Sequence, residues 1–541
     1  MSHPAAGWRC LAYIAAATGP LLACGDESAQ RAPGEYSDAE KVGGLAVVCY
    51  MTDFDSLNPL VSPDQGAADL RLLLFTPLVL YGEAGEYRPL LANDWAWEAD
   101  QRVLVLRIRQ DLTWHDGTPV TAEDVAWTLR IAADPEYSYL SDDFTALRDV
   151  AVVDSATLEV RFAEPFIAGL EAFVGLPILP RHLLADLPIV DFATAEYHRA
   201  PVGSGPFRFA NRRSDGSIIL ERASGYPEDL GRPFLDRLVL RTIPEKASLV
   251  VEVETSGVDL CVTTSSVADA VERSRVEVTP IEPAATQVVP LNTRIAPLDD
   301  ARVRRALSAA LRRSEIAATI SSIARPARNP LPESSPWYDS DLLQADDDSA
   351  LAVSLLEDAG WPLTGDVRRN AQGQELRFTL LAPQVTEVPM VMVQAQLRRL
   401  GVQVDLRFME WTSYVGLLQS PDDRPAAMAL GFVPSRVFNV ESDLYSTFHT
   451  GEYSNLGFYS VPEVDALLER LMTALPTEER AAIYDELQRR VVEDVPIIYT
   501  INEPRLLIRG PRLQGVAVDL NGPFASVTKW WISPTPRRIG G

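Results

Sequence analysis

Between Val103 and Arg109, the apolar residues Leu104, Leu106 and Ile108 recur at every second position, which places them on one face of a β-strand. Asp116-Gly117 follows and indicates a tight turn, because glycine reaches positive φ without a steric penalty. Thr121 precedes Asp124 by three residues, which is an N-capping pattern. The apolar positions behind this cap share one helical face: Ala122, Val125, Ala126 and Leu129. The stretch therefore predicts a strand, a turn and a capped helix, and nothing in it activates a nucleophile.

Strand-like runs alternate with helical runs over most of the chain, which predicts an α/β fold. The clearest helices are expected over Ala301 to Arg313, Val388 to Leu400 and Glu478 to Glu493. The clearest strands are expected over Val402 to Phe408 and from Val495 to Tyr499. The sequence contains no internal repeat.

The N-terminal region carries a short apolar run, Leu11 to Ala23. This run is too short to span a membrane and has the length of a signal-peptide core, so residues 1–23 are predicted to be a signal peptide. It ends in LLAC at Leu21 to Cys24, which matches a bacterial lipobox and predicts lipidation of Cys24. The alternative is an ordinary secretory signal, with Cys24 left as a thiol.

Residues 24–43 are predicted to be a lipidated cysteine with a flexible tether, because Gly25 to Lys41 lacks apolar periodicity. The folded body is expected to begin near Gly44. It contains two cysteines, Cys49 and Cys261, which fall in the same predicted domain. A disulfide and a pair of buried free thiols remain equally good interpretations, and one bridge alone would not hold a core of this size together.

The chain is acidic, with 49 lysines and arginines against 75 aspartates and glutamates, and a formal net charge of −26. Such a surface repels nucleic acid and anionic lipid headgroups, so neither is an expected partner. The hydrophobic fraction of 47% indicates a soluble globular protein, and 541 residues are ample for a large buried core. At roughly one domain per 100 to 200 residues, two to four domains are expected.

The motifs of common catalytic sites do not occur in the sequence: HExxH, GxSxG, GxxxxGK[ST], GxGxxG and CxxC. Ser204 in PVGSGPF lacks the spacing of a nucleophile elbow and is expected in a backbone turn. His115 is expected to be a structural turn residue. The remaining histidines of the mature chain do not stand at metal-ligand spacing: His182, His198 and His449. The prediction is a protein that is not an enzyme, without a metal site and without a cofactor.

The segment from Leu106 to Leu129 resembles the extracellular solute-binding proteins of family 5, which serve ABC importers for peptides, nickel, some oligosaccharides and related solutes. Six further segments resemble this family in the same order: TDFDSLNPL (52–60), LANDWAWEAD (91–100), ILPRHLL (178–184), PVGSGPFRF (201–209), LNTRIAPLDDARVRRALSAAL (291–311) and NLGFYSVPEVDALLERL (455–471). Taken singly, most of these segments are loops and caps that any globular protein could carry. Seven in register identify the chain as a member of the family.

The resemblance implies an α/β, two-lobe periplasmic-binding-protein fold with an additional domain inserted in the first lobe. Carried onto this chain, the parts are lobe I at 45–75 plus 203–285 plus 498–535, the inserted domain at 76–202, and lobe II at 286–497. The chain would cross between the lobes near Pro283 to Pro290 and near Asp494 to Ile498.

The resemblance also implies a solute site in the cleft between the lobes, which close over the ligand about a hinge. In lobe I, the loop from Asp53 to Gln65 resembles a ligand-contacting segment, with Ser62, Asp64 and Gln65 as polar candidates. The candidates in lobe II are Trp411, Tyr414, Phe432, Arg436, Asn439 and Asp443. Ordinary core packing is an equally good interpretation of Trp411 and a better one of Phe432, since large aromatic residues usually fill cores.

The segment from Gly431 to Asp443 departs from the pattern of peptide-binding members of the family. Those members commonly place an aspartate there, which pairs with the α-ammonium group of the peptide. No acid occurs from Gly431 to Val440, where Arg436 and Asn439 stand instead, and Glu441 and Asp443 come later. Either one of these later acids takes the role, or the protein does not hold a free peptide N-terminus. An arginine in the cleft suits a carboxylate or a phosphate.

The sequence therefore predicts a lipid-anchored, extracytoplasmic monomer that is the substrate-binding component of an ABC importer. It would capture a peptide-like or other small to medium solute and deliver it to permease subunits, whose ATPases supply the energy. One alternative is a ligand-sensing or peptide-chaperone protein that is not coupled to import. Another is an enzyme on the same scaffold, for which His115 and Ser204 are the residues to mutate.

Overall fold

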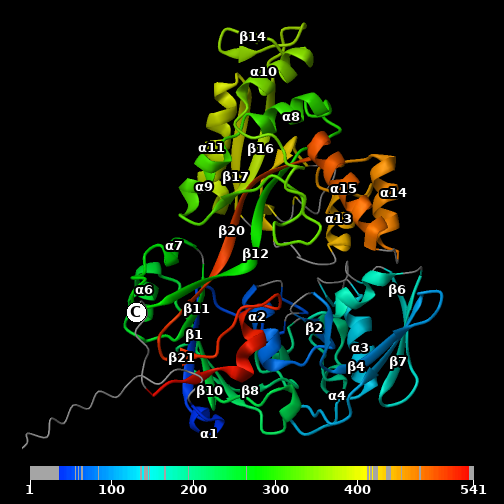
Figure 1. Cartoon of the computed structure of the whole chain (residues 1–541), viewed down its shortest axis with the longest axis vertical. Coiled ribbons are helices and arrows are strands. Elements are labelled where there is room, and N and C mark those ends of the chain that lie inside the picture. Colours follow the sequence, from blue (N-terminus) through cyan, green and yellow to red (C-terminus); the bar gives the residue numbers. More distant parts are fainter. Residues whose placement is uncertain are drawn as a thin grey trace, which may run out of the picture.

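The computed structural model describes residues 36–534 apart from short gaps. The gaps are residues 55, 59, 63–64, 83–84, 135–136, 139–143, 145, 164–165, 193, 264, 411–412, 415–416, 418–423, 434–439, 453 and 474–476. The description extends to the backbone alone at residues 65, 67–68, 167–168, 189–190, 282–285, 385 and 430–433. Figure 1 shows two bodies, one above the other, that are joined by two long strands.

The lower body, lobe I, is built on a mixed sheet whose strands come from distant parts of the chain. Strand β1 pairs in parallel with β10 on one side and with β11 on the other. The antiparallel strands β9 and β8 follow beyond β10. The bounds are β1 (Leu45–Tyr50), β8 (Phe207–Arg212), β9 (Ile218–Arg222), β10 (Arg237–Thr242) and β11 (Leu260–Thr263). Helices α6 (Lys246–Glu254) and α7 (Ser265–Ala268) share an apolar cluster with β1 and β11, and α2 (Gln65–Leu74) packs against β8.

Two long strands carry the chain between the bodies and pair with each other antiparallel. In lobe I, β20 also pairs with β11, whereas in the upper body β12 pairs with β19 and β20 pairs with β13. The bounds are β12 (Glu277–Pro290), β13 (Arg325–Pro326), β19 (Leu430–Val433) and β20 (Ile497–Arg509). The register shifts between Ile281 and Ala285, so a bulge interrupts the ladder between its lobe I part and its upper part.

A smaller antiparallel sheet, the inserted domain, lies between α2 and β8 in the sequence. Its strand order is β4-β5-β7-β6, and α3 packs against β6 and β7. The bounds are β4 (Ala92–Trp97), β5 (Val103–Ile108), α3 (Ala122–Ala132), β6 (Leu147–Val152) and β7 (Thr157–Phe162). Thr121 and Asp124 form the expected capping box before α3. One apolar cluster includes both Leu106 of this sheet and Val48 of β1, so the inserted domain and lobe I share a core.

The upper body, lobe II, has a three-stranded parallel sheet in the order β17-β16-β18. Four helices pack around this sheet, and three more form a separate group with its own apolar cluster. The first set is α8 (Ala301–Ala309), α9 (Arg313–Ile320), α10 (Ser349–Asp358) and α11 (Glu387–Arg399), around β16 (Arg377–Pro383), β17 (Gln403–Met409) and β18 (Ala427–Met428). The second set, at the right of Figure 1, is α13 (Glu441–Phe448), α14 (Pro462–Leu471) and α15 (Thr477–Asp494).

The remaining elements are short. They are α1 (Asp38–Lys41), β2 (Val79–Tyr81), β3 (Tyr87–Pro89), η3 (Ile167–Phe173), α4 (Arg181–Leu184), α5 (Ile189–Phe192), η4 (Glu196–Arg199), η5 (Glu228–Leu230), β14 (Leu363–Thr364), β15 (Val367–Arg368), η6 (Gln384–Thr386), β21 (Leu513–Gln514), η8 (Pro523–Lys529) and β22 (Trp531–Ile532). The arrangement confirms the predicted α/β, two-lobe fold with a domain inserted in the first lobe.

One expected helix is shorter than predicted. The apolar pattern predicts a helix from Ala301 to Arg313, but α8 ends at Ala309 and α9 begins at Arg313. The Arg313 side chain is fully buried, and its Nε donates to the carbonyl oxygen of Tyr499 in β20 at 2.6 Å. The break between the helices accompanies this buried arginine, which the period of apolar residues does not reveal.

Candidate functional site

Two of the candidate ligand contacts are buried in this conformation. Ser62 is 5% exposed and Tyr414 is 0% exposed. The Tyr414 hydroxyl donates to the carbonyl oxygen of Ala429 at 2.5 Å, and its ring packs against Leu381 and Met428. Tyr414 is therefore a packing residue of lobe II here and does not offer a surface to a solute.

Six other candidates are described in part or not at all. Asp64, Trp411, Arg436 and Asn439 lie outside the described residues. Gln65 is the first residue of α2, and Phe432 lies in β19 in register with Gln287 of β12; of these two candidates the backbone alone is described. The backbone of Phe432 is thus placed beside a crossing strand.

The two acids after the expected cleft segment occupy different environments at the start of α13. Glu441 is 2% exposed and forms an ion pair with Arg480 of α15. Asp443, two residues later, is half-buried. The charge of the Glu441 carboxylate is thus compensated by Arg480 inside lobe II. Of these two acids, Asp443 is the one with exposed surface.

A group of polar residues gathers where the crossing strand β20 enters lobe I. We call it the junction cluster, and its members are Tyr50, Asp69, Ser265, Glu503 and Arg505. Tyr50 ends β1 and Ser265 begins α7 just after β11, so both stand at the carboxyl ends of neighbouring parallel strands. Glu503 and Arg505 are two residues apart on β20 and share one face of that strand. In sheets with parallel strands, this edge is the usual place for a ligand.

The junction cluster holds opposite charges in a partly buried setting. Arg505 binds Asp69 with both terminal nitrogens, at 3.3 and 2.5 Å, and the Asp69 side chain is only 8% exposed. The Ser265 hydroxyl donates to the Glu503 carboxylate. Burial nevertheless raises the pKa of Glu503 above its ordinary value. Burial and then the Asp69 charge raise the pKa of Tyr50, whose buried hydroxyl has no hydrogen-bond partner among the described residues.

A pocket of about 310 Å³ lies next to the junction cluster, on the lobe II side of β20. We call it the arginine pocket; its lining residues are Arg325, Pro326, Arg328, Asn329, Leu331, Glu333, Tyr338, Leu343 and Asn502. Arg325 is in β13 and in register with Asn502, which is the residue immediately before Glu503 of the junction cluster. The pocket and the junction cluster are therefore carried by consecutive residues of one strand.

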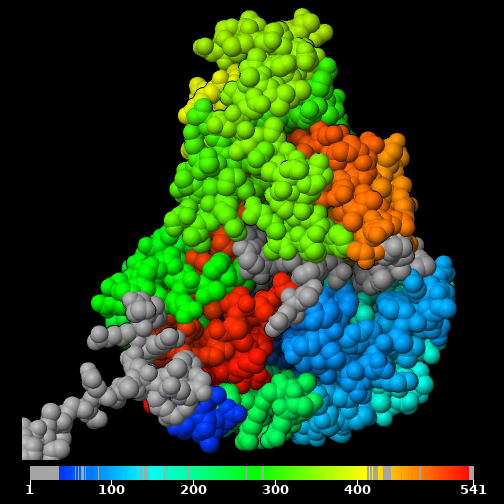
Figure 2. Space-filling view, viewed as in Figure 1, coloured from blue at the N-terminus to red at the C-terminus, as the bar shows by residue number. Residues whose placement is uncertain are grey.

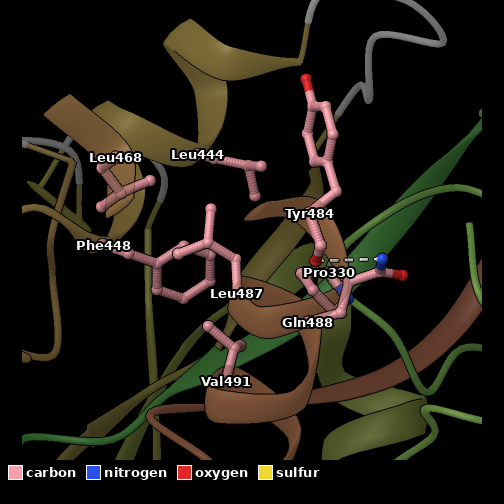
Figure 3. Close-up of a pocket in the computed structure, with 8 residues that line it drawn as sticks. All are labelled: Pro330, Leu444, Phe448, Leu468, Tyr484, Leu487, Gln488 and Val491. Atoms are coloured by element: carbon pink, nitrogen blue, oxygen red, sulfur yellow. Dashed lines mark hydrogen bonds between the residues drawn. The ribbon is translucent and has the colours of Figure 1, made fainter. Parts of the chain in front are cut away.

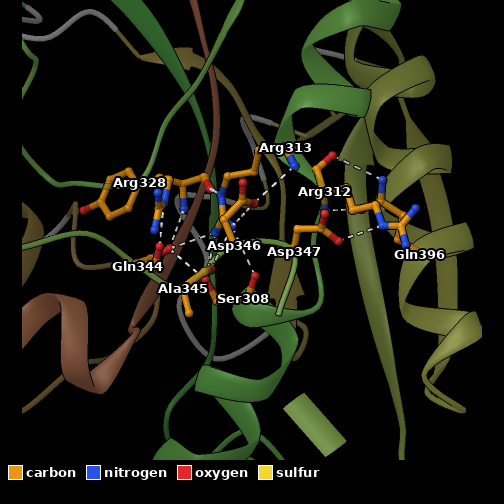
Figure 4. A network of polar contacts seen from close by, with 10 residues as sticks. Ser308, Arg312, Arg313, Arg328, Gln344, Ala345, Asp346, Asp347 and Gln396 are labelled. Carbon is orange, nitrogen blue, oxygen red and sulfur yellow. Dashed lines mark hydrogen bonds and ion pairs between the residues drawn. The ribbon is translucent and has the colours of Figure 1, made fainter. Parts of the chain in front are cut away.

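A buried network of hydrogen bonds holds Arg328 of the arginine pocket in position. Arg328 donates through Nε to the carbonyl oxygen of Gln344 at 2.6 Å. The Gln344 side chain in turn accepts from Arg313 at 3.2 Å and donates to the carbonyl oxygen of Ile497 at 2.6 Å. Figure 4 shows Gln344, Arg328 and Arg313 in this network. Arg313 also pairs with Asp346 at 2.9 Å, so this buried charge is compensated.

Side chains outside the crossing strands also join lobe I and lobe II. The Ser322 hydroxyl of lobe II donates to Asp269, the residue after α7, at 2.5 Å, and Ile323 packs against the apolar cluster under α6 and α7. Met472, at the end of α14, packs against the core shared by lobe I and the inserted domain. In Figure 2 the α13–α15 group, in orange, lies over the inserted domain. These contacts join the two lobes in the described structure.

Two other hollows differ from the arginine pocket in location or size. A groove of about 1060 Å³ is lined by residues of lobe I and the inserted domain, including Tyr81, Arg88 and Tyr226, and by none of lobe II. Closure of the lobes would not assemble it. Figure 3 shows a hollow between α13, α14 and α15, lined by Phe448 and Tyr484 among others. Its volume of about 10 Å³ is at most that of a single water.

His115 and Ser204, the two residues considered for an enzymatic role, both form hydrogen bonds that hold the PVGSGPF turn in place. His115 accepts from the backbone nitrogen of Gly203 at 3.1 Å and donates through Nε2 to the carbonyl oxygen of Gly205 at 3.0 Å. Burial lowers the pKa of His115 to about 4, so the ring is neutral. The Ser204 hydroxyl accepts from the backbone nitrogen of Thr76 at 3.2 Å. Both side chains therefore organise backbone. Among the described residues, no group of three or more His, Cys, Asp and Glu residues is arranged to hold a metal ion.

Asp69, Arg505, Arg325 and Arg328 were not among the predicted site residues. One local signal for Arg505 exists: it stands directly before the apolar run Leu506 to Ile508 in a strand that is mostly buried. A charge at such a position requires a partner. Its partner Asp69 lies 436 residues away, which no local pattern can indicate.

Known proteins resemble this chain over nearly its whole length. The family model described as "Bacterial extracellular solute-binding proteins, family 5 Middle" matches residues 86–455. The oligopeptide-binding protein AppA of Bacillus subtilis (strain 168) is 25% identical over 95% of this chain and 96% of its own length. The nickel-binding periplasmic protein of Escherichia coli (strain K12) is 24% identical over 83% of this chain and 88% of its own length.

A solved structure shows the same fold. The structure of Bacillus subtilis AppA in complex with a nonapeptide superposes with a TM-score of 0.74, at 22% identity, over 91% of this chain and 99% of that one. The family model alone covers well over half of the chain. The chain therefore belongs to family 5 of the bacterial extracellular solute-binding proteins, and its role is that of the substrate-binding component of an ABC importer.

Proposed function

We propose that this protein captures a peptide-like solute between its lobes and delivers it to an ABC permease. One observation carries the proposal: β20 places the arginine pocket and the junction cluster on the consecutive residues Asn502 and Glu503, where the chain passes between the lobes. A solute in the pocket would touch lobe II and the strand that leads from it into lobe I. Permeases and their ATPases are the partners that the proposal requires.

The charges of the arginine pocket suit a solute that carries a carboxylate. Arg325 and Arg328 line the pocket, and a guanidinium binds a carboxylate through two parallel hydrogen bonds. A short peptide ends in a carboxylate and presents amide groups along its chain, so it can bind these arginines and the polar residues beside them.

Similar proteins support a ligand of this kind without deciding it. The structure of Bacillus subtilis AppA contains a nonapeptide, and the Helicobacter pylori protein DppA was solved with the peptide STSA. The Escherichia coli relative, by contrast, is named for nickel. A peptide-like solute is the proposal because the arginine pocket offers guanidinium groups, which repel metal cations.

The proposed mechanism is closure driven by the ligand. The ladder between β12 and β20 is interrupted between Ile281 and Ala285, where a hinge costs the fewest backbone hydrogen bonds. Met472 and Ser322 make their contacts across the lobes in the closed form. The solute would bind both lobes only in the closed form, so its affinity for that form is higher than for the open form. This difference in affinity shifts the population towards the closed state.

We also propose that the mature protein is an anchored monomer, held to a membrane through lipid on Cys24 at the start of its tether. Such an anchor would keep the binding protein near the permease. Members of the family act outside the cytoplasm. In the part of the chain that the structure describes, no helix is long and apolar enough to cross a membrane.

Native mass spectrometry identifies the solute that stays bound to the protein during purification, provided that no step removes or replaces the ligand.

Calorimetric titration with synthetic peptides of the same length as that solute then measures their affinity for the unaltered protein and for the double variant Arg325→Gln/Arg328→Gln. The double variant should bind at least about tenfold more weakly, since two charge-assisted contacts are lost. Arg407→Gln, whose side chain is 65% exposed on β17, is the matched control and should bind normally. Equal affinity of the double variant and the control would overturn this placement of the site.

A further inference from the structure

Cys49 and Cys261 lie beside each other in lobe I. The parallel pairing of β1 with β11 places Cys49 in register with Cys261. Both side chains are 0% exposed and belong to the apolar cluster that includes Leu249 and Val267, from α6 and α7. Residues in register on parallel strands point to the same face of the sheet, so both sulfur atoms lie under these helices.

The spacing of the strands fits a covalent bond between the two residues. Neighbouring strands lie about 4.8 Å apart, which is within the range of roughly 4.4–6.8 Å between the Cα atoms of disulfides. The structure holds both residues as thiols. Burial, and then a hydrogen bond to the Cys261 side chain, raise the pKa of the Cys49 thiol. The two side chains are therefore already in contact.

The location of the protein favours oxidation of this pair. Members of the family act outside the cytoplasm, where disulfides form and persist. The sequence has four cysteines, of which Cys10 lies in the predicted signal peptide and Cys24 is the proposed lipidation site. Cys49 and Cys261 would then be the only thiols of the mature chain, and neither has a competing partner within it.

We propose that Cys49 and Cys261 are joined by a disulfide in the mature protein. Two S–H bonds break and one S–S bond forms; two protons leave, and two electrons reduce the disulfide of an extracytoplasmic thiol–disulfide oxidoreductase to its dithiol. Because the thiolate is the reacting form and burial suppresses it, the bond forms during folding, before α6 and α7 cover the two strands.

The bridge would tie together two strands that support the junction cluster. Cys49 directly precedes Tyr50, and Cys261 lies on β11, which leads to Ser265 of α7. A covalent link between β1 and β11 therefore holds the carboxyl ends of both strands in one position. The proposal depends on an extracytoplasmic location and not on the nature of the solute, so its failure would leave the proposed function in place.

The test is an alkylation experiment on the full chain, exported by a bacterial host with an intact disulfide-forming pathway. The protein is quenched with acid, denatured without reductant, treated with iodoacetamide and digested for mass spectrometry. We expect neither Cys49 nor Cys261 to be alkylated, and their two peptides to be found linked, with a mass lower by two hydrogen atoms than their sum. After reduction both should be alkylated. Alkylation of both before reduction, or a mixed disulfide of either with another molecule, would overturn the proposal.

A second measurement uses Cys49→Ala/Cys261→Ala. The Tm of the exported chain should fall on addition of a reductant, whereas the Tm of the double variant should not change. If the reductant leaves both Tm values unchanged, the proposed support of β1 and β11 is refuted. If the double variant does not fold, the alkylation pattern of the unaltered chain still decides the proposal.

Discussion

Arg505 of a crossing strand and Asp69 of α2 form an ion pair of 2.5 Å between Nη2 and Oδ2, and the Asp69 side chain is only 8% exposed. The pair fastens β20 to lobe I beside the proposed solute site. Asp69→Asn removes the negative charge and leaves the guanidinium without its partner, so the free energy of unfolding should fall by about 1–2 kcal/mol after allowance for the exposure of Arg505.

Denaturant titration of the free protein measures this loss. Asp94→Asn is the matched control, because Asp94 pairs with Arg107 at 3.3 Å with both side chains more than 60% exposed. It should leave the free energy of unfolding nearly unchanged. A double-mutant cycle with Arg505→Gln separates the pair from its surroundings, and a coupling energy of zero would contradict the assigned role.

The buried neutral ring of His115 makes stability depend on pH. Its pKa is lowered to about 4 by burial, whereas the unfolded chain takes up this proton near pH 6.5. Between these values the unfolded state binds more protons, so stability falls as the pH is lowered from about 6.5 to 4. The contribution of this residue should reach about 3 kcal/mol at the acid end.

Burial lowers the pKa of His198 in the same direction, so the two histidines should act together. The measurement is the free energy of unfolding between pH 7 and 4, for the chain and for His115→Gln. The variant should have a lower stability at pH 7 but a shallower slope. An unchanged slope would show that His115 does not titrate as proposed.

Local patterns in the sequence predict the secondary-structure elements well, whereas the contacts of the proposed site join residues that no local pattern connects. Alternation of apolar residues located β5, and the Thr121 cap located α3, because both signals arise within a few residues. The break at Arg313 was missed, since its partners lie in other elements. The Asp69–Arg505 pair and the arginine pocket each join parts that are remote in sequence. Such contacts depend on how the chain folds, and a single sequence does not indicate which distant residues meet.

The PVGSGPF segment allows a test of close packing. A Cβ atom added to Gly203 would stand 1.8 Å from the carbonyl oxygen of Leu74, and backbone cannot easily move away. Gly203→Ala should therefore lower the free energy of unfolding by more than about 2 kcal/mol. At Gly225 the nearest atom is the Thr113 hydroxyl at 3.5 Å, an ordinary contact. Gly225→Ala is the control in the same denaturation experiment, and equal losses at the two positions would contradict this argument.

Met472 provides a test of closure, because it reaches from lobe II to the core of the other body. Met472→Ala removes apolar contact in the closed form, so it should weaken solute binding by about fivefold, which corresponds to about 1 kcal/mol. Met392 packs against the core of lobe II instead, and Met392→Ala should lower stability without this loss of affinity. Small-angle scattering should show a larger open fraction for Met472→Ala. Unchanged affinity and scattering would mean that the contact does not stabilise the closed form.

The environments of Glu441 and Asp443 sharpen the question of peptide ends. Glu441 is buried against Arg480, so its carboxylate is not free to bind an α-ammonium group. We therefore expect N-acetylated peptides to bind as tightly as the same peptides with free amines, within about threefold. Calorimetric titration of matched pairs measures this ratio. Glu441→Gln should lower stability, because it leaves the Arg480 charge buried and unpaired, but it should not change the ratio. A large preference for free amines that Asp443→Asn abolishes would instead show that Asp443 holds the peptide N-terminus.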